Sequence, residues 1–164
     1  MPRLLAKHIA QAVVSVRAMS LQAKEKLAAE IRRTQPNLLA SVLVQSRFGS
    51  SNEDLDVLLN FLFVCYETVR LAGINLPTIS EQTQETCLAR VVGRAQFIEG
   101  LTIDMRLKAV DDQVNSHSEP SLLALAVSEL GVVRNVKGES DSGKYFAMSA
   151  INLVESIAYT IKGA

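Results

Sequence analysis

The sequence is poor in residues that break or cross-link a chain. Its 164 residues include four prolines, eight glycines, two cysteines and no tryptophan. So few glycines and prolines argue against a β protein rich in turns and loops. No uninterrupted apolar run reaches the roughly 18 residues that a membrane-spanning helix needs. With 48% apolar and 21% charged residues, the composition is that of a globular domain.

The sequence also lacks a charge excess of either sign. Seventeen lysines and arginines balance seventeen aspartates and glutamates. A surface that binds nucleic-acid phosphates usually carries a basic excess, so nucleic-acid binding is not expected. The two cysteines, Cys65 and Cys87, lie in helix-like segments, which favours buried thiols in a reducing compartment over a disulfide. We therefore predict a cytoplasmic protein.

The first 33 residues have the apolar spacing of an amphipathic helix. There is no glycine or proline between Arg3 and Arg33, and apolar residues recur at steps of three and four. We predict one long helix, with a kink near Ser20 as the alternative. No acidic residue precedes Glu25, whereas four basic residues do, which is also typical of an organelle-targeting peptide or of a helix that lies on a membrane surface. A structural helix is favoured because the apolar pattern continues past Glu25 without a break.

A short helix and then an almost wholly apolar one follow. Pro36 fits the first turn of a helix that ends by Arg47, because the N–H that proline lacks has no partner there. Ser51 or Asn52 is expected to cap the next helix, Leu55–Ala72. That helix is apolar on nearly all sides, so it must be covered from several directions. We place it at the centre of the molecule.

A second long helix is predicted after residue 77. Thr78 and Glu81 have the spacing of a capping box, and the helix is expected to extend to about Val114. Apolar residues alternate along it at steps of three and four, a seam suited to packing along another helix. Gly93 and Gly100 weaken it and indicate either a close partner helix or a bend.

The second half of the sequence repeats the order of the first. Thr34–Ala40 matches Ser118–Ala124 at four of seven positions. Pro120–Leu130 and Lys144–Lys162 then correspond to the short helix and the central apolar helix, and the latter is also expected at or beside the centre.

This order predicts an all-α fold in a single domain, residues 1–164. We expect a six-helix domain built from two related three-helix units, residues 1–74 and 78–163. Each unit consists of a long, a short and a medium-length helix in that order, and the two units pack with approximate two-fold symmetry. Because so few helices have to cover two largely apolar ones, a homodimer is also expected.

One stretch has the spacing of a phosphate-binding loop. Gly138–Lys144 fits that pattern, but Tyr145 stands where a hydroxyl should bind magnesium, and Glu139 and Asp141 add negative charge. An ordinary flexible loop over Gly131–Gly143 is therefore favoured.

No catalytic or metal-binding pattern is present in the sequence. The Glu-x-x-His pairs of a helical di-metal site are absent. Neither His8 nor His117 accompanies a recognisable catalytic turn, and the cysteines show none either. We name no catalytic residue, no metal site and no cofactor.

The candidate binding residues are polar side chains within the apolar helices. Asn60 and Glu67 lie on one of them, and Asn152 and Ser156 lie on the other. An unpaired polar group in a core costs about 1–3 kcal/mol, so each of these side chains needs a partner. A groove between the two units, lined by these four residues, is one interpretation. Hydrogen bonding between helices is the alternative.

These observations favour a non-enzymatic helical protein–protein interaction module of the adaptor or inhibitor/immunity type. Surplus apolar helix surface and the lack of a catalytic constellation support it. The polar residues in apolar helices support the alternative, a helical enzyme or carrier that binds a small ligand in an interhelical pocket. The expected partner is another protein or a second copy of the chain; attachment to a membrane surface is not favoured.

Overall fold

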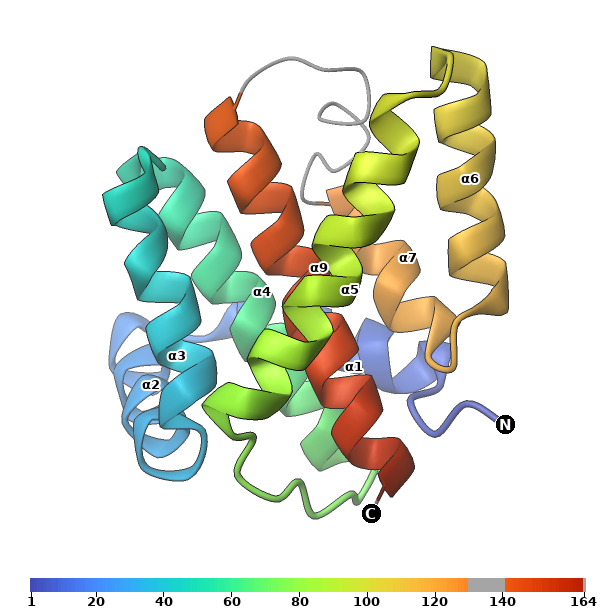
Figure 1. Cartoon of the computed structure of the whole chain (residues 1–164). Coiled ribbons are helices and arrows are strands. Elements are labelled where there is room, and N and C mark those ends of the chain that lie inside the picture. The colour runs from blue at the N-terminus through green and yellow to red at the C-terminus, as the bar shows by residue number, and fades with distance from the viewer. Residues whose placement is uncertain (130–140, 164) are drawn as a thin grey trace.

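A computed structural model describes residues 1–129 and 141–163, and these residues form a helical bundle (Figure 1). They contain eight α-helices, one 3₁₀-helix and no strand, so the predicted all-α class is confirmed for the described residues. In chain order the elements are α1 (Ala6–Ala18), α2 (Leu21–Thr34), α3 (Pro36–Leu43), η1 (Val44–Phe48), α4 (Asn52–Leu71), α5 (Glu81–Glu99), α6 (Ile103–Ser116), α7 (Pro120–Glu129) and α9 (Asp141–Gly163).

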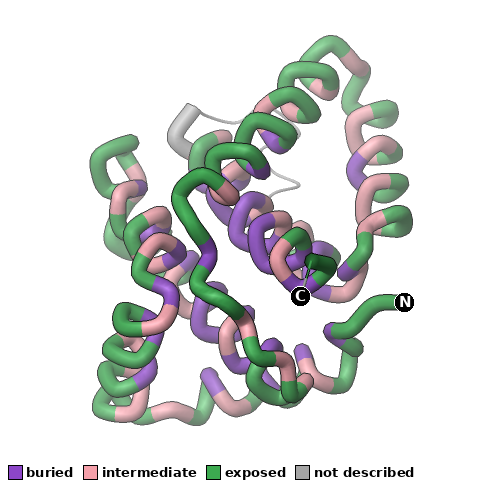
Figure 2. Tube along the Cα trace, turned by 60° about the horizontal axis from the view of Figure 1, so that its bottom comes forward, coloured by how far each residue is buried: buried purple, intermediate pink, exposed green. Residues whose placement is uncertain are grey.

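The helices α4 and α9 form the centre of the bundle, as predicted. They contact each other, and both carry long series of buried apolar residues on the inside of the bundle (Figure 2). On α4, Leu58 and Leu62 are fully buried, and on α9, Leu153 and Ile157 are almost fully buried. Because other helices of the same chain cover both, the reason given above for expecting a homodimer does not hold.

The first predicted long helix is two helices, so the prediction of one helix is wrong and the kink near Ser20 is a complete break. Met19 and Ser20 have extended backbone, and the Ser20 hydroxyl accepts a hydrogen bond from the Ala23 N–H at 3.1 Å. This cap stabilises the start of α2. The break lets α1 pack along α4 while α2 packs against α3.

The second predicted long helix is also two helices, α5 and α6, so the expected count of six is wrong for the described residues. α5 ends at Glu99 with Gly100 as its C-cap, and Thr102 caps α6 by accepting from the Met105 N–H at 3.3 Å. Gly100 therefore marks a bend, one of the two readings given above. A Cβ on Gly93 would meet no atom of the described residues within 4 Å, so none of the described helices comes close enough to explain that glycine.

The capping predictions hold at one site and fail at another. Ser51 accepts from the Asp54 N–H and caps α4, as expected. The predicted capping box at Thr78 is wrong, because Ser80 caps α5 by accepting from the Thr83 N–H. The Thr78 hydroxyl instead donates to the Thr34 carbonyl at 3.0 Å, a tertiary contact between segments far apart in sequence.

Two buried polar residues that precede prolines hold the extended segments of the chain in place. Gln35, just before α3, donates to the Pro77 carbonyl at 2.9 Å and accepts from the Ile79 N–H at 2.9 Å. Glu119, just before α7, accepts from the N–H groups of Arg3 and Leu4 at 3.0 and 2.9 Å. Each side chain thus fixes the segment that leads into a helix of the other half of the chain.

The N-terminal segment is also fixed to the end of the chain. The Arg3 guanidinium donates to the Ile161 carbonyl at 2.8 Å, and Leu4 is fully buried. None of the described helices is both long enough and apolar enough to cross a membrane. Most of the predicted loop Gly131–Gly143 and the first three residues of the Gly138–Lys144 pattern lie in residues 130–140, outside the described residues. The last residues of both belong to α9, which begins at Asp141, so the prediction of a loop as far as Gly143 is wrong at its end.

Candidate functional site

Residues of α5, α6, α7 and α9 line a pocket of about 720 Å³, called the first pocket below. Its lining is mainly apolar, and a pocket of this size and character is typical of a small-molecule site. The apolar side chains that line it are Val91, Val92, Ala95, Ile98, Val110, Val114, Leu123, Val127, Ala147, Met148 and Ile151.

The first pocket is open because α6 buries little of its surface. Val110 is the one residue of α6 that is buried, whereas α2, a helix of the same length, buries Leu27 and Ile31. The α6 residues Ile103 and Met105 are about half exposed. The α6 residues Val110 and Val114 line the first pocket instead of closing a tightly packed core.

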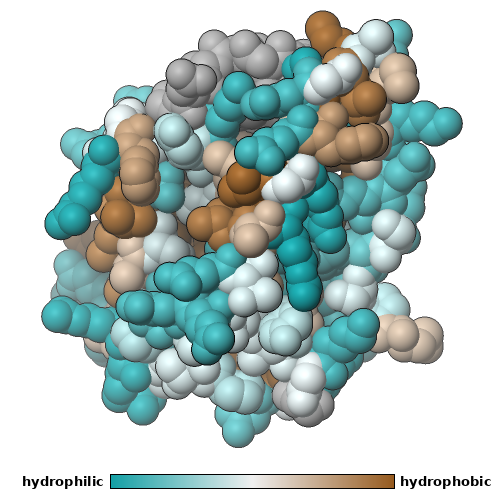
Figure 3. All heavy atoms as spheres, in the orientation of Figure 1, coloured by the Kyte–Doolittle hydropathy of each residue, from teal (hydrophilic) through white to brown (hydrophobic). Residues whose placement is uncertain are grey.

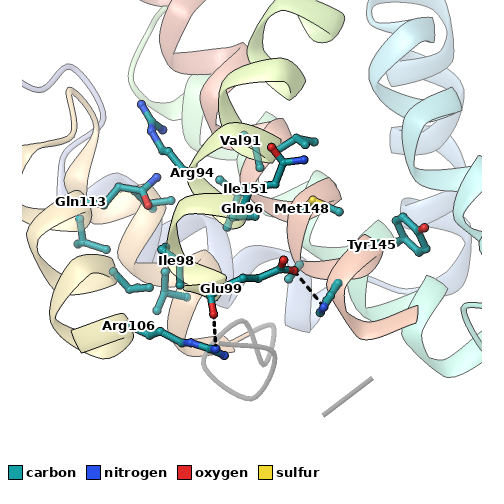
Figure 4. Close-up of a pocket in the computed structure, with 18 residues that line it drawn as sticks. Val91, Arg94, Gln96, Ile98, Glu99, Arg106, Gln113, Tyr145, Met148 and Ile151 are labelled. Carbon is teal, nitrogen blue, oxygen red and sulfur yellow. Dashed lines mark hydrogen bonds and ion pairs between the residues drawn. The ribbon is translucent and has the colours of Figure 1, made fainter. Parts of the chain in front are cut away.

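Arg94 and Gln113 supply polar groups on the side of the first pocket away from Tyr145 (Figure 4). Arg94 lies on α5, its side chain is 45% exposed, and its Nη1 atom donates to Glu155 Oε1 on α9 at 2.6 Å. Gln113 lies on the neighbouring helix α6. These two residues and Ile98 also line a second pocket of about 940 Å³, so the two pockets adjoin.

The second pocket contains a hydrogen-bonded network centred on Glu155. His117 Nε2 lies 3.5 Å from Glu155 Oε1, and both side chains are nearly buried. Burial alone raises the pKa of Glu155, but the hydrogen bonds from His117 and Arg94 and the charge of Arg94 outweigh it, so this pKa lies below its ordinary value. Glu155 is therefore ionised at neutral pH and holds the Arg94 guanidinium at the boundary between the pockets.

The hydrogen bonds of His117 assign its tautomer. Its Nδ1 accepts from the Glu119 N–H at 3.0 Å, so Nδ1 carries no proton. The proton of the neutral ring is then on Nε2, which faces Glu155. Neither ring nitrogen has a lone pair left for a ligand, and His117 acts as a structural link between α7 and α9.

The other side of the first pocket is polar but already engaged. Lys144 Nζ donates to Glu99 Oε1 at 3.0 Å. Arg106 donates to the carbonyls of Leu101 and Glu99 at 2.9 and 2.7 Å and so caps the end of α5 (Figure 4). These cations stabilise the α5–α6 corner and the start of α9, where Tyr145 packs against Phe48 of η1 with ring centroids 5.5 Å apart.

The structure places the four predicted binding residues in three different environments. Asn60 accepts from Lys24 Nζ at 2.9 Å, facing α2, and lines a separate pocket of about 390 Å³. Glu67 is buried and pairs with Arg70 one turn away, at 2.6 Å. Asn152 and Ser156 lie together on α9, where Asn152 donates to the Gln84 carbonyl of α5 at 3.2 Å.

These four residues do not line one groove, and none of them lines the first or the second pocket. The bonds of Asn60 and Asn152 run between helices, as the alternative interpretation expects, whereas the Glu67–Arg70 pair lies within α4. The Asn152 Oδ1 and Ser156 Oγ atoms, however, are buried and have no hydrogen-bond partner among the described residues. Whether these four side chains bind a ligand or partner stays a prediction.

The cysteines and the first histidine have structural surroundings. Cys65 and Cys87 are free and buried, and burial raises the pKa of both thiols. His8 Nδ1 accepts from the Leu5 N–H at the start of α1. Within the described residues, no group of three histidine, cysteine or carboxylate side chains is arranged to hold a metal ion.

No family model, curated protein or solved structure matches this chain. The site therefore stands on its own geometry. Sequence reasoning found the seam of α5 that lines the first pocket, including Val91 and Ile98, but missed Arg94 and Gln113. No pattern in the sequence marks these two residues, because only the bend at Gly100 brings α6 back toward α5.

Proposed function

We propose that the protein is a non-enzymatic carrier or sensor that binds a small, mainly apolar ligand in the first pocket. The observation that carries this proposal is the volume of about 720 Å³, which falls in the range of roughly 300–1,000 Å³ typical of small-molecule sites. The lining combines an apolar wall with a few polar side chains at its edges, and such polar groups usually orient a ligand.

The residue types in the first pocket favour binding over chemistry. Its described lining contains no histidine, cysteine, serine or threonine, so it offers no nucleophile with an adjacent base. Its one carboxylate, Glu99, is paired with Lys144. Ligand capture by apolar burial is the activity that such a lining supports.

Binding of Nile red, a neutral dye that fluoresces in apolar surroundings, tests this proposal. It is measured on two variants that each replace one alanine of α5 by tryptophan. Ala95 lines the first pocket, and Ala89 is exposed on α5 outside it. An indole at position 95 fills part of the pocket. We expect Ala95→Trp to weaken Nile red binding by about tenfold or more, and Ala89→Trp to leave it within about twofold.

Thermal unfolding monitored by circular dichroism verifies that both variants remain folded. Absence of Nile red binding to the wild-type protein, or equal binding by the two folded variants, would refute a ligand site at this pocket. Loss of binding in Ala95→Trp alone supports it.

A second candidate function is self-association, the homodimer form of the predicted interaction module. The large apolar side chains Phe97, Ile103 and Met105 are 70%, 51% and 53% exposed around the corner where α5 meets α6. Apolar atoms are visible at this corner in the upper right of Figure 3. A second copy of the chain is the occupant we propose, because burying the same apolar patch from two chains needs no complementary charge.

We further propose that the chain is an altered duplication, with units α1–α4 and α5–α9. Three pairs of helix contacts support this: α1–α4 with α5–α9, α3–α4 with α7–α9, and α2–α3 with α6–α7. Gln35 and Glu119 stand at matching places, and the buried residues Leu4 and Ile79 each lie two positions before a helix. A cytoplasmic location stays a proposal, supported by the two free buried thiols.

A further inference from the structure

We infer that the ligand of the first pocket is a single-chain amphipathic carboxylate whose head group binds Arg94 and Gln113. This inference rests on the proposed function and names the class of ligand. It follows from three observations: the hydrogen-bonding capacity left on Arg94 and Gln113, the charge around the two adjoining pockets, and the apolar wall that starts beside Arg94.

Arg94 has donors left for a ligand. A guanidinium carries five N–H groups in a planar fork that matches a carboxylate. In the described part of the chain, the only hydrogen bond of this side chain is from Nη1 to Glu155. Its side chain is 45% exposed and lines both pockets, so the remaining donors are accessible where the pockets meet.

Gln113 adds a second donor across the same boundary. Its side chain is partly buried and lines both pockets, and its amide has no hydrogen-bond partner within the described residues. A partly buried amide without a partner gains stability when an acceptor reaches it. Arg94 from α5 and Gln113 from α6 lie on the same side of the first pocket in Figure 4.

The charge around the pockets favours an anion. Among the described residues, three carboxylates line the two pockets, namely Glu99, Asp112 and Glu155. Five cations of the same part of the chain line them, so these cations exceed the carboxylates by two, although the whole chain has no net charge. A local positive potential of this kind attracts an anionic head group. The cations are Arg90, Arg94, Arg106, Lys144 and Lys162.

The hydrocarbon tail of such a ligand can pack on apolar side chains that begin next to Arg94 and Gln113. Val91 and Ile98 on α5 flank Arg94 by about one turn on either side, and Val110 and Val114 on α6 flank Gln113. Ile151 of α9 also lines the pocket. A ligand with a carboxylate at one end and a saturated chain matches this order of polar and apolar groups.

Isothermal titration calorimetry with three probes of equal chain length tests the inference. The probes are dodecanoate, 1-dodecanol and dodecyltrimethylammonium, each used below its micellar concentration or solubility limit. We expect the wild-type protein to bind dodecanoate about tenfold more tightly than the alcohol, and the cation most weakly. Equal affinity for the acid and the alcohol would overturn the inference while leaving the proposed function intact.

Variants of two arginines on α5 separate a local head-group contact from a general charge effect. Arg94→Met is expected to remove the preference for dodecanoate over dodecanol. Arg90→Met removes the same charge from a residue that lines the second pocket and stacks on Tyr159, with its guanidinium carbon 5.6 Å from the ring centroid. It is expected to keep most of the preference, and equal losses in both variants would argue against a contact at Arg94.

Two further variants guard against a folding defect, because Arg94→Met leaves Glu155 without its arginine. Arg94→Lys keeps the charge but lacks the fork and is expected to retain only part of the preference. Gln113→Leu is expected to reduce affinity for dodecanoate without affecting the alcohol. Failure of all three probes to bind or to displace Nile red would remove the proposed function, and with it this inference.

Discussion

Replacing Glu119 by glutamine removes one of the two acceptors that hold the N-terminal segment to α7. Both carboxylate oxygens accept backbone N–H groups, from Arg3 at 3.0 Å and Leu4 at 2.9 Å, and Glu119 is only 3% exposed. In Glu119→Gln, one oxygen still accepts a bond, but an NH₂ group then faces the other N–H donor. The substitution keeps the size and shape of the side chain and changes its charge and its hydrogen bonding.

The expected loss of stability follows from that geometry. A hydrogen bond to a charged acceptor contributes about 1.5–3 kcal/mol, and a buried donor left unpaired adds a further cost. The neutral amide is easier to bury than the carboxylate, which offsets part of this loss. We expect the free energy of unfolding to fall by about 2 kcal/mol, which lowers a urea midpoint by about 1 M at a slope of about 2 kcal/mol/M.

A double-mutant cycle measured by circular dichroism tests whether the loss arises at the N-terminal segment. The cycle combines Glu119→Gln with deletion of Met1–Leu4. In the shortened chain both N–H partners are gone, so the substitution should cost less than about 0.5 kcal/mol. Glu85→Gln, at an exposed position of α5, serves as a control with an expected change within about 0.5 kcal/mol. An equal cost of Glu119→Gln in the full and shortened chains would refute the reasoning.

Two other predictions concern the Glu155 network and the α5–α6 corner. Folding lowers the pKa of Glu155, so the unfolded chain binds more protons than the folded one. The contribution of Glu155 to stability is therefore complete above the ordinary glutamate pKa. It is lost as the pH falls through the folded-state pKa. Glu155→Gln should make urea unfolding less sensitive to acid over that range, and an unchanged pH profile would count against the network. Light scattering should give twice the mass of one chain for the wild-type protein and the mass of a single chain for Phe97→Asp. Thr86 is exposed on α5 away from this corner, so the control Thr86→Asp should remain dimeric. A monomeric wild-type protein would rule out self-association.

The order and placement of most helices were predictable because local spacing carries that information. Pro36 and Pro120 occupy first turns, and Ser51 caps α4, through hydrogen-bonding requirements that involve only neighbouring residues. The central position of α4 followed from apolar side chains on nearly every side of the helix, and that of α9 from its largely apolar sequence and its place in the repeated order. Such helices have no face that water can solvate without cost.

The breaks at Met19–Ser20 and Gly100–Thr102 were harder to predict, because the apolar spacing continues across both of them. A helix cap contributes only about 1 kcal/mol, so the presence of a residue such as Ser20 does not by itself decide whether a new helix starts there or one helix continues through it. Packing of α1 on α4 and of α2 on α3 decides the outcome at Ser20. The preference of Ser80 over Thr78 as the cap of α5 likewise depends on Gln35 and Thr34, which bind the preceding segment.

The sequence by itself determined that this chain is helical, where most of its helices lie, and which two are buried, because those properties depend on neighbouring residues and on apolar periodicity. Only the tertiary structure decided that the two long amphipathic stretches divide, and that α6 stands far enough from the core to leave a pocket. It also decided that Arg94 and Gln113 both lie where that pocket adjoins the second one. Contacts between distant segments create those features, and their energies are comparable to the local preferences that they override.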